Sequence, residues 1–152
     1  MSKFRLSRRS RNNLEGVKQP LIDVVELAIQ LTEVDFGVIE GVRTQERQKQ
    51  LVASGASQTM NSKHLTGDAV DVMAYIGSRG SWESTLYPVI ADGFKEASQT
   101  LDVSIRWGGA WTVSDLRLWG RSSEEAMWSY VEARRSKGRR PFLDMGHFEL
   151  MN

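Results

Sequence analysis

The sequence predicts a single α+β domain over residues 1–152. A chain of this length fits one domain and can bury a sizeable core without covalent cross-links. Its composition is ordinary for a globular protein, with 40% hydrophobic and 26% charged residues. Helical and strand patterns follow one another without the regular strand–helix–strand order of a parallel sheet. This irregular order favours the α+β class.

Apolar residues at three- and four-residue spacing predict four helices. Thr44 is a plausible cap for the second of them. Pro88 either kinks the third helix or marks its true first turn, because proline is tolerated only where no backbone N–H is needed. The predicted helices cover residues 17 or 20 to 32, 47–53, 82–101 and 124–135.

Short β-branched and alternating runs predict the strands. In the second strand, Ala69, Asp71 and Met73 share one face, because successive side chains of a strand point to opposite faces. Residues 77–81 are expected to turn the chain after it, and residues 1–13, which are basic and polar, to form a loosely ordered arm or docking segment. The predicted strands cover residues 36–39, 68–75, 103–107 and 147–150.

Composition excludes several functional classes. The chain has no cysteine, so disulfides, thiolate metal sites and a cysteine nucleophile are ruled out. The net charge is only +1, and nucleic-acid binding would rest on two local basic segments alone, residues 3–11 and 134–140. No apolar run is long enough to span a membrane, and no apolar stretch follows the basic N-terminus as in a secretory signal. We therefore expect no specific nucleic-acid partner, no transmembrane segment and synthesis in the cytoplasm.

The two histidines of the chain, His64 and His147, suggest a metal site together with Asp71. A carboxylate on an otherwise apolar strand should be paired, ligated or protonated, because an isolated buried charge is costly. Two imidazoles and one carboxylate suit zinc. Three protein ligands also leave one tetrahedral position open for water, which is typical of catalytic zinc. The sequence therefore predicts a catalytic metal site.

Such a site needs a general base within reach of the attacking water. Asp144 lies three residues before His147, and Glu149 lies two residues after it on the same strand face. Spacing alone leaves both open. Arg43 lies where a predicted strand passes into a helix, a common position for a functional side chain.

These segments resemble a known family. Ser62-x-His64-x-x-Gly67-x-Ala69-x-Asp71 matches the S-x-H-x-x-G-x-A-x-D signature of M15-type zinc peptidases at every fixed position. The ending Asp144-x-Gly146-His147-x-Glu149-Leu150 is similar to that of the bacteriophage L-alanyl-D-glutamate endopeptidases, or endolysins. Residues 41–44 and 106–111 resemble two further family motifs, with Ala110 standing where the family often has an acid.

The resemblance implies a small antiparallel sheet with flanking helices, as in D-Ala-D-Ala peptidases and hedgehog proteins. It also implies Zn²⁺ on His64, Asp71 and His147, and Asp144 as the base that deprotonates water and protonates the leaving amine. Arg43 would hold or polarise the substrate carbonyl, and Ser62 would support the substrate or the ligand loop. The expected substrate is the stem peptide of peptidoglycan, cleaved between L-alanine and D-glutamate.

Two alternatives stay open: a D-Ala-D-Ala carboxypeptidase or dipeptidase of the same family, and a non-catalytic, hedgehog-like metal-binding module. The endolysin interpretation implies a monomer that accumulates in the host cytoplasm. It would reach the cell wall from the periplasmic side after release through a holin-type pore. Attraction of the basic ends to the wall or membrane fits the same interpretation.

Overall fold

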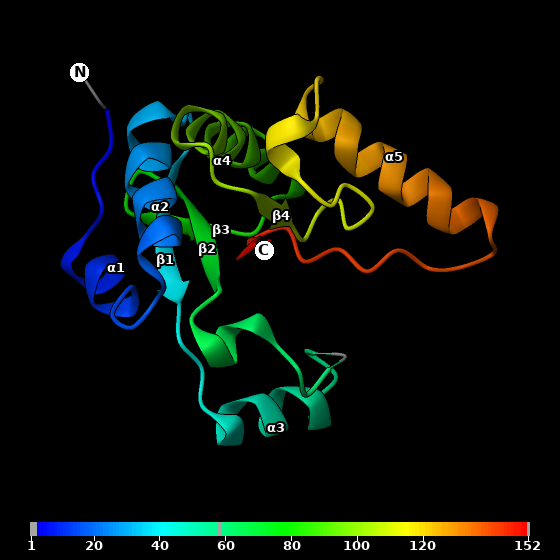
Figure 1. The fold of residues 1–152 in the computed structure, drawn as a ribbon, viewed down its shortest axis with the longest axis horizontal. Helices are drawn as coiled ribbons and strands as arrows, with labels where there is room; N and C mark the ends of the chain where they lie inside the picture. Colours follow the sequence, from blue (N-terminus) through cyan, green and yellow to red (C-terminus); the bar gives the residue numbers. More distant parts are fainter. Residues whose placement is uncertain (1–2, 58, 152) are drawn as a thin grey trace.

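The computed structural model describes residues 3–57 and 59–151 and contains one mixed α/β unit built on a small antiparallel sheet (Figure 1). The order across the sheet is β1-β2-β5-β4, with β3 paired to the remaining part of β2. All four pairings are antiparallel, as the predicted fold class requires. The strands are β1 (Asp35–Glu40), β2 (Ala69–Ile76), β3 (Arg79–Ser81), β4 (Ile105–Trp107) and β5 (His147–Leu150).

Helices flank the sheet and extend away from it. In Figure 1, α3 projects as a separate lobe below the sheet, and α5 reaches sideways from it. The helices α2 and α4 pack against each other, and α4 also contacts α5. Among the described residues, no helix combines the length and the apolar character needed to cross a bilayer. The helices are α1 (Arg8–Asn13), α2 (Gln19–Leu31), α3 (Gln45–Ala53), α4 (Tyr87–Leu101) and α5 (Ser123–Ser136).

Local sequence signals explain where these helices begin. Thr44 caps α3 by accepting a hydrogen bond from the Arg47 amide at 3.0 Å, as the sequence predicts. Ser122 caps α5 in the same way through Glu125 at 3.2 Å. Pro88 lies in the first turn of α4. The prediction that this proline marks the true start of the helix is therefore confirmed, and the alternative of a kink is wrong. The predicted start at Trp82 was too early, because a 3₁₀ turn (Ser84–Leu86) precedes α4.

The sheet buries one face in the core and turns the other toward a cleft. On β2, Val70, Val72 and Ala74 are fully buried, whereas Asp71 and Met73 on the opposite face are only partly buried. This alternation confirms the predicted period of two. The core continues into β5 and α4, where the rings of Phe148 and Phe94 stack with centroids 3.8 Å apart. The apolar face therefore anchors the strand that presents Asp71 to the cleft.

The N-terminal segment corrects one prediction. The sequence predicts a loosely ordered arm over residues 1–13. Residues 1 and 2 lie outside the described part of the chain, and the rest of this segment contains α1, which packs against β1. The reason is a polar anchor that apolar periodicity does not reveal. Ser10 is buried, and its hydroxyl accepts a hydrogen bond from the Val38 amide at 2.9 Å, while Asn13 donates to the Val38 carbonyl at 2.8 Å. Both bonds hold α1 to the first strand.

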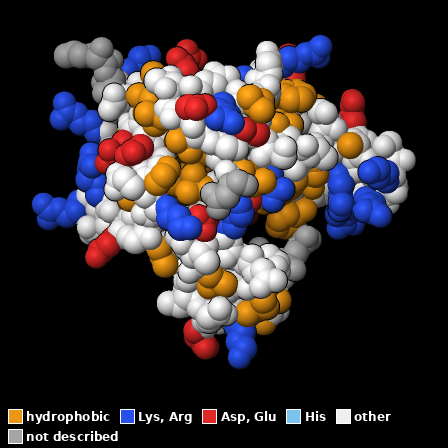
Figure 2. Space-filling view, in the orientation of Figure 1, with side chains coloured by type: hydrophobic (Ala, Val, Ile, Leu, Met, Phe, Trp, Pro, Cys, Tyr) orange, Lys and Arg blue, Asp and Glu red, His pale blue; other side chains and the backbone are white. Residues whose placement is uncertain are grey.

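Two smaller differences concern the turns of the sheet. Residues 77–81 were predicted as a turn only, but Arg79–Ser81 forms β3 and pairs with the end of β2. The strand predicted from residue 103 begins at Ile105. At the far end of the molecule, Figure 2 shows basic side chains gathered at the tip where α5 ends, and the residues 135–140 there are exposed. This is the second basic segment seen in the sequence.

An ion pair ties the start of α2 to the start of the Asp71 strand. The Lys18 ammonium lies 2.9 Å from an Asp68 carboxylate oxygen, and Thr66 also donates a hydrogen bond to that carboxylate. Burial alone raises the pKa of Asp68, but the hydrogen bond from Thr66 and the charge of Lys18 outweigh it and lower the pKa. Because the folded pKa is below the unfolded one, the pair stabilises the fold above about pH 4, and this is lost as the pH falls further.

We therefore expect Asp68→Asn to lower the free energy of unfolding by up to about 1 kcal/mol at pH 7, the scale of a partly exposed pair. The difference from the parent protein should close below about pH 4 in urea denaturation. Lys18→Gln should reproduce the loss at pH 7. A difference that persists unchanged at pH 3 would contradict this account of Asp68.

Candidate metal centre

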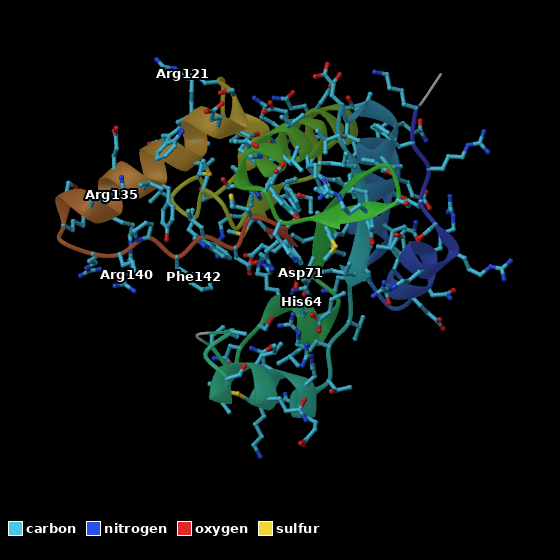
Figure 3. The ribbon with its side chains drawn as sticks, turned by 180° about the vertical axis from the view of Figure 1, so that it is seen from behind. His64, Asp71, Arg121, Arg135, Arg140 and Phe142 are labelled. Carbon is cyan, nitrogen blue, oxygen red and sulfur yellow. The ribbon has the colours of Figure 1, made fainter. Side chains whose placement is uncertain are left out.

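Three separate pieces of backbone bring His64, Asp71 and His147 together at the base of the cleft. His64 lies in a short 3₁₀ helix (Lys63–Thr66), Asp71 in β2 and His147 at the start of β5. Asp71 and His147 are direct partners in the β2–β5 register, and Figure 3 shows Asp71 next to His64. Gly67, with φ of 77°, ends the 3₁₀ helix in the left-handed conformation and sends the chain into β2. The sequence motif therefore encodes a turn that points His64 back over Asp71.

The distances between the three groups fit a metal ion. The Asp71 Oδ1 atom lies 3.1 Å from His64 Nε2 and 3.2 Å from His147 Nδ1, and all three atoms lie within 4.8 Å of one another. Zinc bonded at about 2.0–2.2 Å in tetrahedral geometry holds neighbouring ligand atoms roughly 3.3–3.5 Å apart. Both histidines are almost completely buried, so their orientation is set by the surrounding protein.

In each histidine ring, the nitrogen that points away from Asp71 makes a hydrogen bond. This bond fixes the tautomer, so that the nitrogen facing Asp71 carries a lone pair. His64 Nδ1 lies 2.8 Å from the Gly41 carbonyl oxygen, to which it can only donate. His147 Nε2 lies 2.8 Å from Glu149 Oε1 and donates to that carboxylate in the same way. In the neutral rings, His64 Nε2 and His147 Nδ1 therefore turn lone pairs toward the Asp71 oxygen. In this state two ring nitrogens and one carboxylate oxygen point their lone pairs at one another, with no proton between them. Such an arrangement fits a divalent cation.

The carboxylates around His147 favour its protonated form. Burial alone lowers the pKa of His147, but its hydrogen bonds with Asp71 and Glu149 outweigh this and raise the pKa to about 9. Burial likewise raises the pKa of Asp71, and the two histidines reverse that effect and hold it well below its ordinary value. The site is thus built to surround positive charge, and it keeps Asp71 ionised as a metal ligand must be.

The structure separates the two acids that spacing left open as the base. Glu149 is a partner of His147: its side chain is 5% exposed, and its second oxygen contacts Arg106 at 3.1 Å and Lys63 at 3.6 Å. Asp144 is 44% exposed toward the cleft, and one oxygen lies 3.9 Å from His147 Nδ1. Among the described residues, its carboxylate accepts no hydrogen bond. Loss of hydration, then repulsion by Asp71, raises the pKa of Asp144, which suits an acid that exchanges protons.

Gly108 holds the Asp144–His147 segment in place. It accepts a hydrogen bond from the Asp144 amide at 2.9 Å and donates one to the His147 carbonyl at 2.8 Å. A Cβ atom at this position would lie 2.2 Å from the Asp144 carbonyl oxygen and 3.0 Å from the His147 Cβ. Only glycine allows the two backbones to approach this closely.

Gly108→Ala is therefore expected to destabilise the protein by about 1–3 kcal/mol through overpacking. It should also lower the activity of the centre by about 10²-fold, because a displacement of roughly 1 Å at reacting groups has that cost. Urea denaturation and initial rates would measure both effects. Gly120→Ala is the matched control, since a Cβ there meets nothing within 4 Å. Equal behaviour of the two variants would contradict a positioning role for Gly108.

Arg43 is buried and engages all five of its N–H donors with protein atoms. Its Nε and Nη2 bind the two oxygens of Glu40 at 2.8 and 2.9 Å, and Nη2 also binds Asp71 Oδ2 at 3.2 Å. Its Nη1 binds Gln48 Oε1 at 2.7 Å and reaches Ser62 Oγ at 3.5 Å. Arg43 therefore fixes the Asp71 oxygen that faces away from the histidines. In these contacts it acts on Asp71 and leaves no donor for a substrate carbonyl.

Ser62 supports the ligand loop. Its hydroxyl accepts a hydrogen bond from the His64 amide at 3.2 Å and thereby caps the 3₁₀ helix. Sequence reasoning missed Gln48, which is fully buried and joins Arg43 to Ser57 at 2.9 Å. A polar residue on a short helix carries no signal of this role, because its partners come from a loop nine residues away. The sequence analysis also missed Glu40, whose carboxylate binds Arg43 from the end of β1.

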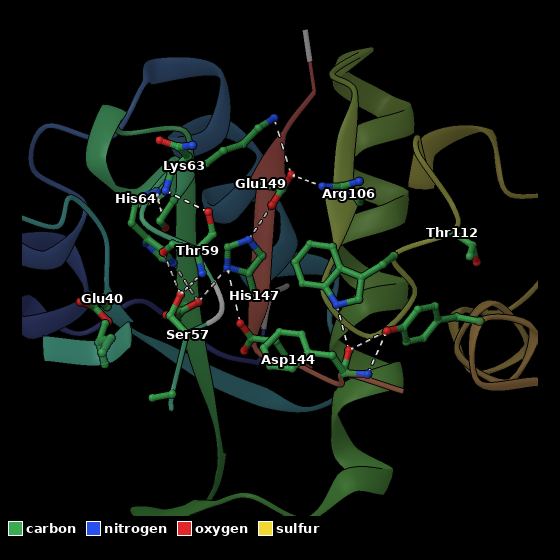
Figure 4. A pocket seen from close by; sticks show the side chains of 18 of the residues that line it. Glu40, Ser57, Thr59, Lys63, His64, Arg106, Thr112, Asp144, His147 and Glu149 are labelled. Carbon is green, nitrogen blue, oxygen red and sulfur yellow. Dashed lines mark hydrogen bonds and ion pairs between the residues drawn. The ribbon is translucent and has the colours of Figure 1, made fainter. Parts of the chain in front are cut away.

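The candidate centre opens into a cleft large enough for a peptide. Its volume is about 1090 Å³, well above that of an ion site alone. Figure 4 shows His64, His147, Asp144 and Glu149 on its floor. The walls come from the α3 lobe and the adjoining loop on one side and from α5 and the following loop on the other. An extended chain can therefore cross the centre between the two walls.

Comparison with known proteins agrees with this architecture. Residues 1–151 match the family model described as phage L-alanyl-D-glutamate peptidase. The L-alanyl-D-glutamate peptidase of Escherichia phage T5 is 31% identical over 115 residues, covering 73% of this chain and 84% of that protein. The peptidase of the same name from Listeria phage A118 is 36% identical over 79 residues, which are 52% of this chain and 27% of that protein.

A solved structure extends the likeness to three dimensions. The L-Ala D-Glu endopeptidase ChiX of Serratia marcescens superposes with a TM-score of 0.72 at 32% sequence identity, covering 98% of this chain and 92% of that one. The fold is therefore that of a peptidoglycan-cleaving endopeptidase. The chain belongs to the phage L-alanyl-D-glutamate peptidase family, and the resemblance read from its sequence motifs is confirmed.

Proposed function

We propose that this endopeptidase depends on zinc and cleaves the bond between L-alanine and D-glutamate in peptidoglycan stem peptides. The observation that carries the proposal is the convergence of His64 Nε2, Asp71 Oδ1 and His147 Nδ1, with ring tautomers fixed by Gly41 and Glu149. Nitrogen and oxygen donors in this number suit zinc, and three of them leave a position for substrate or water. Bound zinc supplies Lewis acidity, which lowers the pKa of a water and polarises a carbonyl.

The residues of this chain would then divide the work of hydrolysis. Asp144 removes a proton from the attacking water and passes it to the nitrogen of D-glutamate as the amide bond breaks. The products are a carboxylate on L-alanine and a free amine on D-glutamate. Arg43 orients Asp71 through its 3.2 Å contact. Its predicted contact with the substrate carbonyl stays a prediction, and it requires the 3.5 Å bond to Ser62 to open.

The biological role that follows is host lysis by a phage endolysin. We propose that the protein acts as a monomer, is held in the host cytoplasm, and attacks the wall after holin-type release into the periplasm. The alternative, a D-Ala-D-Ala carboxypeptidase or dipeptidase with the same metal chemistry, differs in the bond that it cleaves. A non-catalytic module has no need for Asp144 as an acid with a free carboxylate facing the cleft.

Mass spectrometry of digested peptidoglycan distinguishes these functions. We expect products that end in a new L-alanine carboxylate and products that begin with a new D-glutamate amine. Activity should disappear with a chelator and return when zinc is added back. Release of free D-alanine without cleavage after L-alanine would overturn the bond assignment. Undiminished cleavage by protein shown to be metal-free would overturn the zinc assignment.

A further inference from the structure

Arg106 is a fixed cation on the cleft wall, and it is not one of the three residues of the candidate metal centre. Arg106 and Glu149 are partners in the β4–β5 register, and Arg106 Nη2 contacts Glu149 Oε2 at 3.1 Å. Its guanidinium also lies over the Trp111 ring, with Cζ 5.0 Å from the ring centroid. An ion pair on one side and an aromatic ring on the other hold the group in one orientation.

Part of this guanidinium remains available to a ligand. Its side chain is 30% exposed and lines the cleft, as Figure 4 shows. Among the described residues, Nη1 of Arg106 has no hydrogen-bond partner. Nη1 is also not buried, so a ligand can reach it. The charge around it is also unbalanced, because Arg106 and Lys63 both contact the single carboxylate of Glu149. The wall therefore presents an ordered N–H edge beside a carboxylate that two cations share.

Other cations of the cleft are less suited to bind an anion near the centre. All five N–H groups of Arg43 already have protein partners. Arg134 donates from Nε and Nη2 to the Arg140 carbonyl at 3.1 and 2.9 Å. It belongs to the basic end of α5, and Figure 3 shows Arg135 and Arg140 of that end far from His64 and Asp71. Compared with these described residues, Arg106 combines proximity to the centre with an unengaged donor.

The position of Arg106 also matches one side of the scissile bond. If Asp144 gives its proton to the amine of D-glutamate, the D-glutamate half of the substrate lies toward Asp144. Trp111 is on that same wall: its indole donates to the Phe142 carbonyl at 2.9 Å, and its ring lies 5.4 Å from that of His147. Arg106 lies over this Trp111 ring. D-glutamate inside a peptide keeps one free carboxylate, whichever carboxyl group is joined onward.

We propose that Arg106 binds the free carboxylate of D-glutamate and so selects acidic stem peptides over amidated ones. The inference rests on the proposed cleavage beside D-glutamate. A guanidinium is the side chain best suited to a planar carboxylate, and such charge-assisted bonds are about twice as strong as neutral ones. Arg106 is accordingly a specificity-determining residue, while the metal ligands and Asp144 carry the chemistry.

The test compares two soluble stem peptides that differ only at this group, one with the free D-glutamate carboxylate and one with its amide. The zinc-loaded parent protein should cleave the acid about 10- to 100-fold more efficiently in kcat/KM, the scale of one hydrogen bond to a charged group. Arg106→Gln should abolish this preference, mainly by raising KM for the acid, so that the kcat/KM values of the variant for the acid and the amide lie within about threefold of each other. Arg106→Lys, which keeps the charge, should retain part of the preference.

Zinc content and thermal melting of each variant separate recognition from folding. Arg134→Gln is the matched control, because it removes the same charge from the outer wall and should leave the acid-to-amide ratio unchanged. An equal loss on both peptides in Arg106→Gln, or equal cleavage of both by the parent, would overturn the inference and leave the proposed function standing. Failure of the parent to cut either peptide after L-alanine would overturn the proposed function and this inference together.

Discussion

Replacing Asp144 by asparagine is expected to slow cleavage of stem peptides by about 10²- to 10⁴-fold, the usual contribution of a general base. The substitution keeps the shape of the side chain and removes its ability to take a proton. Because Asp144 is not one of the three converging donors, the variant should still bind one zinc ion per chain. Single-turnover rates on purified peptidoglycan, together with metal content, would measure both results.

Asp102→Asn is the matched control for this change. Asp102 is 88% exposed at the end of α4 and has φ of 56°, a conformation that asparagine also tolerates. Its activity should equal that of the parent protein. If Asp144→Asn kept full activity with zinc bound, Asp144 would not be the base. Glu149 would be a poor substitute, since both its oxygens are already engaged by His147, Arg106 and Lys63.

The second large effect is expected from Asp71→Asn. This change removes the negative charge on which His64, His147 and Arg43 all converge, with little change in volume. Removing a residue that hydrogen-bonds to a metal ligand typically lowers the affinity for the metal 10- to 100-fold. Removing the charge of a ligand itself should lower that affinity more. Zinc occupancy at equimolar metal should fall close to zero. Cleavage should fall by at least about 10³-fold, because the metal contributes several kcal/mol to the transition state.

Metal titration by competition with a chromogenic chelator gives a readout that does not depend on activity. Asp102→Asn again serves as the control and should bind zinc like the parent. Thermal melting of metal-free samples would identify any loss of folding in Asp71→Asn. Full zinc occupancy in a folded Asp71→Asn protein would show that the metal is held elsewhere.

Much of the site could be predicted because its ligands lie in short segments whose turns are local. His64 and Asp71 are seven residues apart, and Gly67 between them supplies the left-handed turn that brings them together. The apolar alternation of β2 marked Asp71 as out of place. The antiparallel sheet and the three metal ligands could then be predicted from the resemblance, because the chain has the family's residue at every fixed position of the Ser62–Asp71 signature. The zinc assignment itself stays a proposal.

The outer partners of the site could not be read from the sequence, because they depend on register between distant strands. Arg106 meets Glu149 only because β4 pairs with β5 in one register, 43 residues apart along the chain. Arg106 thereby holds the second oxygen of Glu149, whose first oxygen binds His147 two residues away on β5. The helix α1 was missed because two hydrogen bonds hold it, one from the Val38 amide to Ser10 and one from Asn13 to the Val38 carbonyl, and these leave no apolar period.

A crystal of the protein grown with zinc and measured on both sides of the zinc absorption edge tests the central claim most directly. We predict one anomalous peak, at about 2.0–2.2 Å from His64 Nε2, Asp71 Oδ1 and His147 Nδ1. Asp144 should face the remaining coordination position without binding the metal directly. A peak bonded to other atoms, or full lytic activity in protein whose crystals show no zinc at these three atoms, would contradict the account.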